Sequence, residues 1–326
     1  MTGDLYSGVS NRGKAHHVLD VDDLGPDGIE EVLSLAERDP RSLVRSLEGA
    51  GVALVFEKPS ARTRNSSELA VVALGGHPVY IQGAEVGIDE RETAEDVART
   101  LACYHRVLCA RVMDHTSLVR MAAGLDAAGV PVPVVNLLSD RAHPCQALAD
   151  LLTLRQHFGT EGARDHPVAY IGDANNVWRS LAIAASMTGI PTRIASPGGY
   201  GPSAEDVALV RSFGGDLVVT GDPAEAAVGA GALYTDVWSS MGQEDEVATR
   251  RVAFAGFCID EGLLARAASD AIVMHCLPAH RGEEISAGVV DGPRSVVWQQ
   301  AANRMHSMRG LLAWLTGPGP ASGSEQ

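Results

Sequence analysis

Three cationic side chains and two hydroxyls lie within one short stretch of this 326-residue sequence. The stretch is Phe56-Glu57-Lys58-Pro59-Ser60-Ala61-Arg62-Thr63-Arg64, which follows an apolar run at 51–56 and precedes a segment of helical character at 66–74. The pattern predicts a buried strand, a polar turn and a helix. Proline and serine are ordinary capping residues at a helix start, but cations are disfavoured there by the helix dipole. The combination favours a binding site for an anion, and among anions a phosphate.

Other polar clusters follow predicted strands or open predicted helices. They are Arg111, residues 143–146 (His-Pro-Cys-Gln), Asn175-Asn176, residues 236–241 and residues 275–281. In open α/β sheets, ligands bind beyond the carboxyl ends of the strands. We therefore expect these clusters to converge on a crevice between two domains.

Strand-like apolar runs alternate with amphipathic helices along most of the chain. We predict strands over 51–56, 79–81, 107–112, 133–136, 168–173, 192–195, 216–219, 232–236 and 271–275, and helices over 26–38, 40–47, 66–74, 93–104, 117–128, 143–158, 177–188, 204–213, 224–228 and 298–315, with a loop at 83–89. This alternation predicts an α/β fold with two doubly wound parallel-sheet domains joined by long helices. The expected domains are 1–145, completed by the helix at 298–316, and 146–297, followed by a disordered Gly/Pro/Ser-rich tail at 317–326.

Composition limits the classes of function. The net charge is −15, from 41 acidic and 26 basic residues, which argues against a nucleic-acid-binding protein. Five cysteines without CxxC spacing indicate free thiols in a reducing cytoplasm. We also expect no membrane span, because no apolar run is long enough, and no signal-peptide core in residues 1–11.

Four motifs together resemble those of the aspartate/ornithine carbamoyltransferases. They are the 56–64 segment, similar to the carbamoyl-phosphate signature FEKxSTRTR; His143-Pro144-Cys145-Gln146, similar to HPCQ; Ser240-Met241-Gly242, similar to the SMG loop of ornithine-specific members; and residues 275–282, which read HCLPAHRG. Residues 172–176 and Asn303-Arg304 add to the likeness. The motifs occur in the family's order and cover nearly the whole chain.

The resemblance implies a carbamoyl-phosphate site with residues from both expected domains. Its residues are Ser60, Ala61, Arg62, Thr63, Arg111, His143, Gln146, Cys276, Leu277 and Arg304. Donors at the helix start would bind the phosphate, and Arg111 would bridge the phosphate and the carbonyl oxygen. His143 and Gln146, three residues apart on one expected helical turn, would contact the carbamoyl group.

The resemblance also implies an ornithine site in the second domain. Its residues are Asn176, Asp236, Ser240 and Met241, with Asp236 suited to the α-ammonium and Cys276 near the side-chain amine. Arg111, His143, Gln146, Asp236 and Cys276 would be the catalytic residues. The implied reaction is attack of a neutral δ-amine on the carbamoyl carbon, a tetrahedral intermediate, and release of phosphate and citrulline. The family needs no cofactor and forms homotrimers, or multiples of trimers, in which a neighbouring subunit completes each site.

Simpler readings of some residues stay open. Cys276 follows an apolar strand and is equally consistent with a buried structural thiol. His275, Cys276 and His280 are metal-binding residue types, but their spacing is poor for zinc and no acidic partner is evident, so we expect no metal. Arg250 and Arg251 are expected to lie on a solvated surface, and Trp238 and Trp298 to pack rather than to bind a ligand.

Two departures from the family pattern affect the expected contacts with the phosphate. Ala61 stands where a threonine is usual, which removes a hydroxyl donor to the phosphate. The loop that reaches the adjacent site is shorter, so its phosphate-contacting residue is Glu85, or Gln82 in another alignment. A carboxylate facing a phosphate dianion would be repulsive unless it is paired. The alternatives to a working ornithine enzyme are therefore a paralogue with another amine acceptor and an impaired ligand-binding protein.

Overall fold

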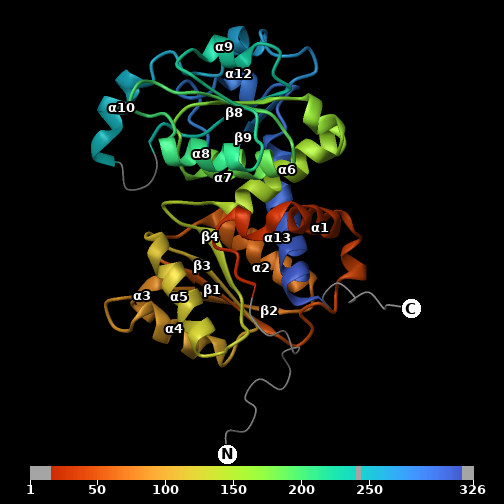
Figure 1. Cartoon of the computed structure of the whole chain (residues 1–326), viewed down its shortest axis with the longest axis vertical. Coiled ribbons are helices and arrows are strands. Elements are labelled where there is room, and N and C mark those ends of the chain that lie inside the picture. The colour runs from red at the N-terminus through yellow and green to blue at the C-terminus, as the bar shows by residue number, and fades with distance from the viewer. Residues whose placement is uncertain (1–15, 240–243, 318–326) are drawn as a thin grey trace, which may run out of the picture. The chain divides into compact units, whose positions relative to one another are not determined.

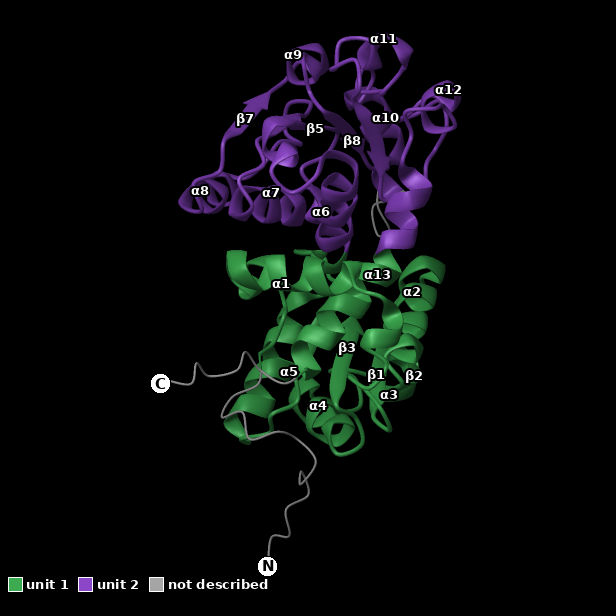
Figure 2. Cartoon of the chain, turned by 90° about the vertical axis from the view of Figure 1, so that its right-hand side faces the viewer, with its two compact units in different colours: residues 1–145, 304–326 green, residues 146–303 purple. Residues whose placement is uncertain are grey.

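The computed structural model describes residues 16–239 and 244–317. The chain divides into two compact units, residues 1–145 with 304–326 and residues 146–303 (Figure 2). Two long helices, α6 (Pro144–Phe158) and α13 (Val297–Thr316), run across the two points of division. Each unit contains one parallel sheet with helices on both faces, which confirms the predicted α/β class (Figure 1).

The first unit has a four-stranded sheet in the order β2-β1-β3-β4. Its strands are β1 (Gly51–Phe56), β2 (His77–Gln82), β3 (Val107–Arg111) and β4 (Val134–Leu138), and its helices are α1 (Gly25–Glu37), α2 (Ala61–Ala73), α3 (Gly83–Val86), α4 (Ala94–Ala102) and α5 (His115–Ala127), with short 3-10 turns at Val21–Leu24 and Pro40–Ser42. Phe56, the last residue of β1, pairs with Gln82 on one side and Arg111 on the other. The residues that follow these three strands therefore start from one edge of the sheet.

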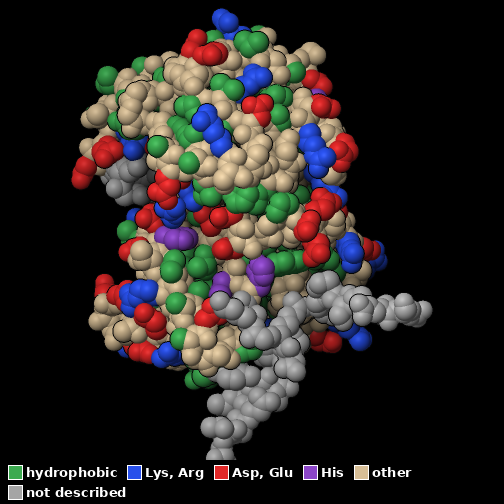
Figure 3. All heavy atoms as spheres, in the orientation of Figure 1, with side chains coloured by type: hydrophobic (Ala, Val, Ile, Leu, Met, Phe, Trp, Pro, Cys, Tyr) green, Lys and Arg blue, Asp and Glu red, His purple; other side chains and the backbone are tan. Residues whose placement is uncertain are grey.

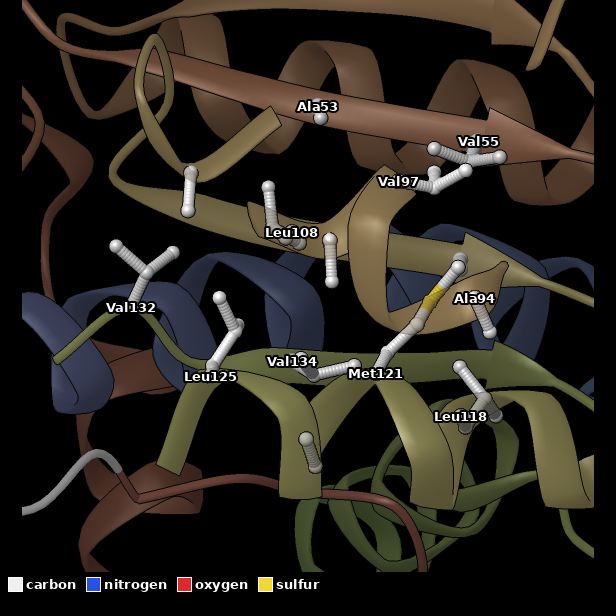
Figure 4. Close-up of a cluster of buried hydrophobic side chains, with 14 of the residues drawn as sticks. Ala53, Val55, Ala94, Val97, Leu108, Leu118, Met121, Leu125, Val132 and Val134 are labelled. Carbon is white, nitrogen blue, oxygen red and sulfur yellow. The ribbon is translucent and has the colours of Figure 1, made fainter. Parts of the chain in front are cut away.

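Strand alternation decides which side chains of this unit face the site. Leu108 and Ala110 of β3 pack with Ala53 and Val55 of β1 in a core that α4 and α5 cover (Figure 4). Because successive side chains on a strand point to opposite faces, Arg111 belongs to the other face. The apolar core thus fixes the strand, and the strand directs the arginine.

The second unit has a five-stranded sheet in the order β7-β6-β5-β8-β9. Its strands are β5 (Val168–Ile171), β6 (Thr192–Ala195), β7 (Leu217–Thr220), β8 (Ala232–Thr235) and β9 (Ile272–His275), and its helices are α7 (Asn176–Met187), α8 (Ala204–Ser212), α9 (Pro223–Ala227), α10 (Val247–Ala253), α11 (Glu261–Leu264) and α12 (Ala287–Val290), with 3-10 turns at Gly162–Asp165 and Glu244–Glu246. The chain winds outward from β5 through β6 to β7 and then returns to the other side of β5 as β8. The carboxyl ends of β5 and β8 form the switch point at which such sheets bind ligands.

Local differences from the sequence predictions have clear causes. Helix α2 begins at Ala61 rather than near residue 66, because the Ser60 side chain caps it by accepting from the N–H of Thr63. Only Pro40–Ser42 of the helix predicted at 40–47 is helical, in a 3-10 turn, and α3 occupies the start of the predicted loop at 83–89. Helices α10, α11 and α12 were missed because four to seven residues carry too little periodicity. The predicted disordered tail lies, beyond Gly317, outside the described residues.

The expectation for Arg250 was wrong. Its side chain is 7% exposed and donates to Asp173 and Glu246 at 2.7 and 2.8 Å, and it also bonds the backbone oxygen of Trp238. Arg251 is exposed, as expected, and pairs with Glu283. Arg250 therefore joins α10 to the segment after β5.

The surface of the described residues carries both acidic and basic side chains. Acidic and basic side chains are interspersed over the face seen in Figure 3. Within residues 16–239 and 244–317, no helix combines the length and apolar character that crossing a membrane requires. Trp298 is 64% exposed, and Trp238 is buried against Phe254.

The adjacent arginines provide a matched test of this packing. Arg250→Ala would remove a buried guanidinium and leave the half-buried carboxylate of Asp173 without its cation, so we expect the free energy of unfolding to fall by about 3–5 kcal/mol. Arg251→Ala, the same change at an exposed neighbour, should alter it by less than about 1 kcal/mol. Urea unfolding of the two variants measures the difference, and equal effects would contradict the assigned role of Arg250.

Candidate active site

The start of α2 supplies hydroxyl and backbone donors. Ser60 precedes the helix in an extended conformation, and its Oγ accepts from the Thr63 N–H at 3.4 Å and donates to the Thr63 Oγ at 3.2 Å. Thr63 is buried, whereas Ala61 and Arg62 are exposed in the first turn. The free N–H groups and dipole of a helix start favour an anion at this end.

Three arginines surround this helix start. Arg304, near the middle of α13, donates to the Thr63 Oγ at 3.4 Å and is only 5% exposed. Arg111 is equally buried, and its Nε has no hydrogen-bond partner among the described residues. Burial, with Arg304 and Arg62 as neighbouring charges, lowers the pKa of Arg111 to about 10. Arg111 is still a cation at neutral pH, so like charges are held together here.

His143 completes the cationic cluster without adding a charge. It is 4% exposed and lies just before α6, not on a helical turn with Gln146 as the sequence suggested. Burial, and then the charges of Arg304, Arg111 and Arg62, holds the pKa of His143 well below its usual range. The imidazole is therefore neutral at pH 7, with one N–H to donate and one nitrogen to accept.

Two buried side chains that sequence reasoning missed shape the turn before His143. The side-chain amide of Asn136 donates to the Ser139 Oγ at 3.1 Å and to the Ala142 oxygen at 3.3 Å. The Ala142 N–H returns a bond to the Ser139 Oγ at 3.2 Å. A polar residue inside the β4 strand was the only signal for this role.

In the second unit, Asp236 follows β8 and is 7% exposed. Its Oδ1 accepts from the Cys276 thiol at 2.9 Å, and its Oδ2 accepts from the Asn175 amide at 2.9 Å. Asn175 also caps α7 through its Oδ1. The Asn175 amide therefore holds the carboxylate. Asn176, predicted to contact ornithine, is the first residue of α7, and its contact with a ligand stays a prediction.

The segment after β9 is held by a buried pair. Leu277, whose φ is +60°, donates its N–H to the Nδ1 of His275 at 2.8 Å. The Nε2 of His275 lies 3.1 Å from Glu284, and both side chains are fully buried. Since Nδ1 accepts, the ring proton is on Nε2 and points to Glu284. This arrangement fixes the backbone that carries Cys276.

Gln146 belongs to the second unit and is almost fully buried. Its amide donates to the Oδ1 of Asp150 at 2.8 Å, and Gln300 donates to the same oxygen at 2.7 Å. The Oε1 of Gln300 in turn accepts from the His275 N–H at 2.9 Å. The network connects α6 and α13 to the end of β9.

The remaining predicted residues are placed less directly. Gln82 ends β2 and Glu85 lies in α3, both exposed, and Ser240 and Met241 lie outside the described residues. Ligand-type atoms of Asp236, His275 and Cys276, and of His280, Glu283 and Glu284, approach within 4.8 Å of one another. The acidic partner that the sequence did not reveal for Cys276 is thus Asp236. Both ring nitrogens of His275 are occupied, so the absence of a metal stays our expectation.

Comparison with known proteins identifies the family. A family model described as the carbamoyl-P binding domain of aspartate/ornithine carbamoyltransferase matches residues 16–156, and the Asp/Orn binding domain of the same description matches residues 164–315. The chain belongs to the aspartate/ornithine carbamoyltransferase family. The sequence resemblance is therefore confirmed at this level.

Individual members of the family are similar over nearly their full length. An ornithine carbamoyltransferase of Acidothermus cellulolyticus is 49% identical, with 92% of this chain and 96% of that protein covered. The crystal structure of the Thermus thermophilus ornithine carbamoyltransferase has a TM-score of 0.82 at 42% identity, covering 92% and 99% of the two chains. The Pyrococcus furiosus ornithine carbamoyltransferase has a TM-score of 0.84 at 39% identity, covering 93% and 98%.

The buried His143 predicts a specific pH dependence of stability. Its pKa is depressed in the folded protein, so the unfolded chain binds a proton near pH 6.5 that the folded chain does not. The contribution of the neutral His143 to the free energy of unfolding should therefore be fully present above about pH 6.5. As the pH decreases below about 6.5, this contribution should be lost, by up to about 1.4 kcal/mol per pH unit. His143→Gln removes this contribution, while His105 and His306, whose pKa values are also lowered, stay in both proteins. Parallel pH profiles of unfolding for the two proteins would refute the prediction.

Proposed function

We propose that this chain transfers the carbamoyl group of carbamoyl phosphate to the δ-amine of L-ornithine, giving L-citrulline and phosphate. The observation that carries the proposal is the cluster of Arg62, Arg111 and Arg304 around a neutral histidine at the start of α2. A phosphate dianion supplies the charge that such a cluster lacks. The family description and the names of the relatives favour ornithine over the alternatives of another acceptor or an impaired protein.

The first step is binding of carbamoyl phosphate. The helix start with Ser60, Arg62 and Thr63 holds the phosphate through N–H, hydroxyl and guanidinium donors. Arg111 and Arg304, both buried, contribute charge without competition from water. Ala61 contributes its backbone only.

The carbonyl oxygen of the carbamoyl group needs donors that strengthen as it becomes an oxyanion. Arg111 and the neutral His143 supply them. A neutral imidazole donates one N–H without adding a further cation to the cluster. Gln146, Leu277 and Cys276 are the residues we assign to the carbamoyl end from the second unit.

Ornithine carries cationic groups that match the acidic side of the second unit. We assign Asn176, Asp236, Ser240 and Met241 to the amino acid. In the free protein the carboxylate of Asp236 accepts from the Cys276 thiol, the Asn175 amide and the Val237 N–H. The ammonium group of ornithine can take the place of one of these neutral donors and form a stronger, charge-assisted hydrogen bond. Binding of the cation is favoured, while the carboxylate stays satisfied without it.

The reaction then balances without a further reagent. The neutral δ-amine attacks the carbamoyl carbon, the carbon–oxygen bond to phosphate breaks in the tetrahedral intermediate, and the amine proton leaves with the phosphate. Because carbamoyl phosphate is already activated, these steps need no redox change.

We extend the proposal to assembly and location. A homotrimer, or a multiple of trimers, is supported by the family resemblance and by the exposed Leu69 and Val72 on one face of α2, and light scattering of the purified protein tests it. In such an assembly Gln82 or Glu85 would contact a neighbouring site. Five free cysteines support a cytoplasmic location, which imaging of the tagged protein tests.

Product formation tests the proposed function directly. Purified protein with carbamoyl phosphate and ornithine should form citrulline, and ornithine should have a higher kcat/KM than lysine, putrescine, N-acetylornithine or aspartate. Absence of citrulline at saturating substrates would refute carbamoyl transfer to ornithine. A preference for putrescine would refute recognition of the amino-acid end.

Arg62 and Arg64 provide a matched pair for the anion site. Arg62→Ala should weaken carbamoyl-phosphate binding by about 10-fold or more, because a charge-assisted contact is lost. Arg64→Ala is the control, since Arg64 pairs with Glu68 at 2.8 Å and lies over the Tyr80 ring. Calorimetry compares the two, and equal losses of affinity would contradict the assignment of Arg62.

A further inference from the structure

We propose that Glu57 is a positioning residue that sets Arg111 in the anion site through the backbone of Met113. The inference rests on the proposed function for its kinetic readout. Glu57 is an acidic residue within the cationic 56–64 segment, which neither capping nor phosphate binding explains. Its contacts give it a different role.

Glu57 forms two hydrogen bonds to the backbone at the end of β3, one on each side of Val112. Its backbone N–H donates to the Arg111 oxygen at 3.0 Å, which extends the β1–β3 pairing one residue beyond Phe56. Its Oε2 accepts from the Met113 N–H at 2.6 Å. One residue therefore fixes the direction in which the chain leaves β3, at the point where Arg111 enters the site.

The chain that follows β2, the other neighbour of β1, packs closely against Glu57. A Cβ atom at Gly83, the first residue after β2, would lie 2.7 Å from the Glu57 Cα and 3.1 Å from its Cγ. No side chain fits in that space, so the chain after β2 packs directly on Glu57. The end of the central strand β1 thus connects to the segments after both of its neighbours.

Arg111 needs such support because its own surroundings oppose it. Arg304 and Arg62 repel its charge, burial disfavours that charge, and its Nε has no partner among the described residues. The backbone must therefore be fixed, and a negatively charged acceptor makes a strong bond to the Met113 N–H.

Two conservative variants distinguish the length of the Glu57 side chain from its negative charge. Glu57→Gln keeps an acceptor oxygen at the same distance and loses the charge. Glu57→Asp keeps the charge, but the side chain is one methylene shorter and cannot span to the Met113 N–H. We expect Glu57→Asp to raise the KM for carbamoyl phosphate about 10-fold or more, with a much smaller change in kcat and in the KM for ornithine, and Glu57→Gln to retain most of the affinity.

A surface substitution and a direct binding assay complete the experiment. Glu48→Ala, at an exposed glutamate whose carboxylate lies 3.8 Å from Arg45, is the control for loss of acidic charge. Titration with inorganic phosphate should show the same order of affinities as the KM values. This titration needs no turnover. If the parent protein formed no citrulline, the proposed function would be refuted, but the titration would still test the role of Glu57. Equal impairment of Glu57→Gln and Glu57→Asp, or a normal Glu57→Asp, would overturn the positioning role.

Discussion

The concentration of positive charge at the start of α2 is the constraint on which the rest of the structure depends. Arg111 and Arg304 are buried, Arg62 lies beside them, and the dipole of α2 adds to the same field. Bringing such groups together is unfavourable in the free protein, so other parts of the fold must hold them. The β1–β3 pairing holds Arg111, α13 carries Arg304, and the Asn136–Ser139 turn places His143. A bound anion would reduce the repulsion among these charges, which is why we propose that this cluster binds a phosphate.

The second unit buries negatively charged groups instead of positively charged ones. Asp236 and Glu284 are buried carboxylates, but their described partners are neutral: a thiol, an amide and backbone N–H groups for the first, and an imidazole and a backbone N–H for the second. Both oxygens of Asp236 are satisfied in this way, whereas the Oε2 of Glu284 has no partner among the described residues. Asp236 can therefore exchange a neutral donor for a cation without leaving a buried charge unpaired. Under the proposed function, the cluster in the first unit binds a dianion and Asp236 in the second unit binds an ammonium group. This division of charge follows the two binding domains described for the family.

Sequence reasoning predicted the order of strands and helices, the fold class and the family, because alternating apolar runs and four motifs extend along the chain. It placed Arg111 at a strand end, where the structure has it, since an arginine after four apolar residues is a local signal. It did not find Asn175 as the partner of Asp236, since adjacent asparagines look alike without the cap geometry. It assigned Arg250 to the surface because its partner Asp173 is 77 residues away in the chain, and no local pattern reports a pairing across such a separation. The neutral state of His143 likewise depends on Arg304, which only the folded chain brings near.

The claim that a neutral His143 lies within a cationic phosphate site can be measured on the ring itself. NMR of protein labelled at histidine nitrogens, with His143→Gln used to assign the signal, reports the protonation state between pH 5 and 8. The structure predicts that the free protein shows His143 neutral throughout most of this range and that added phosphate shifts its signals, because a dianion then offsets the surrounding arginines. A ring that titrates near pH 6.5 and does not respond to phosphate would contradict the account.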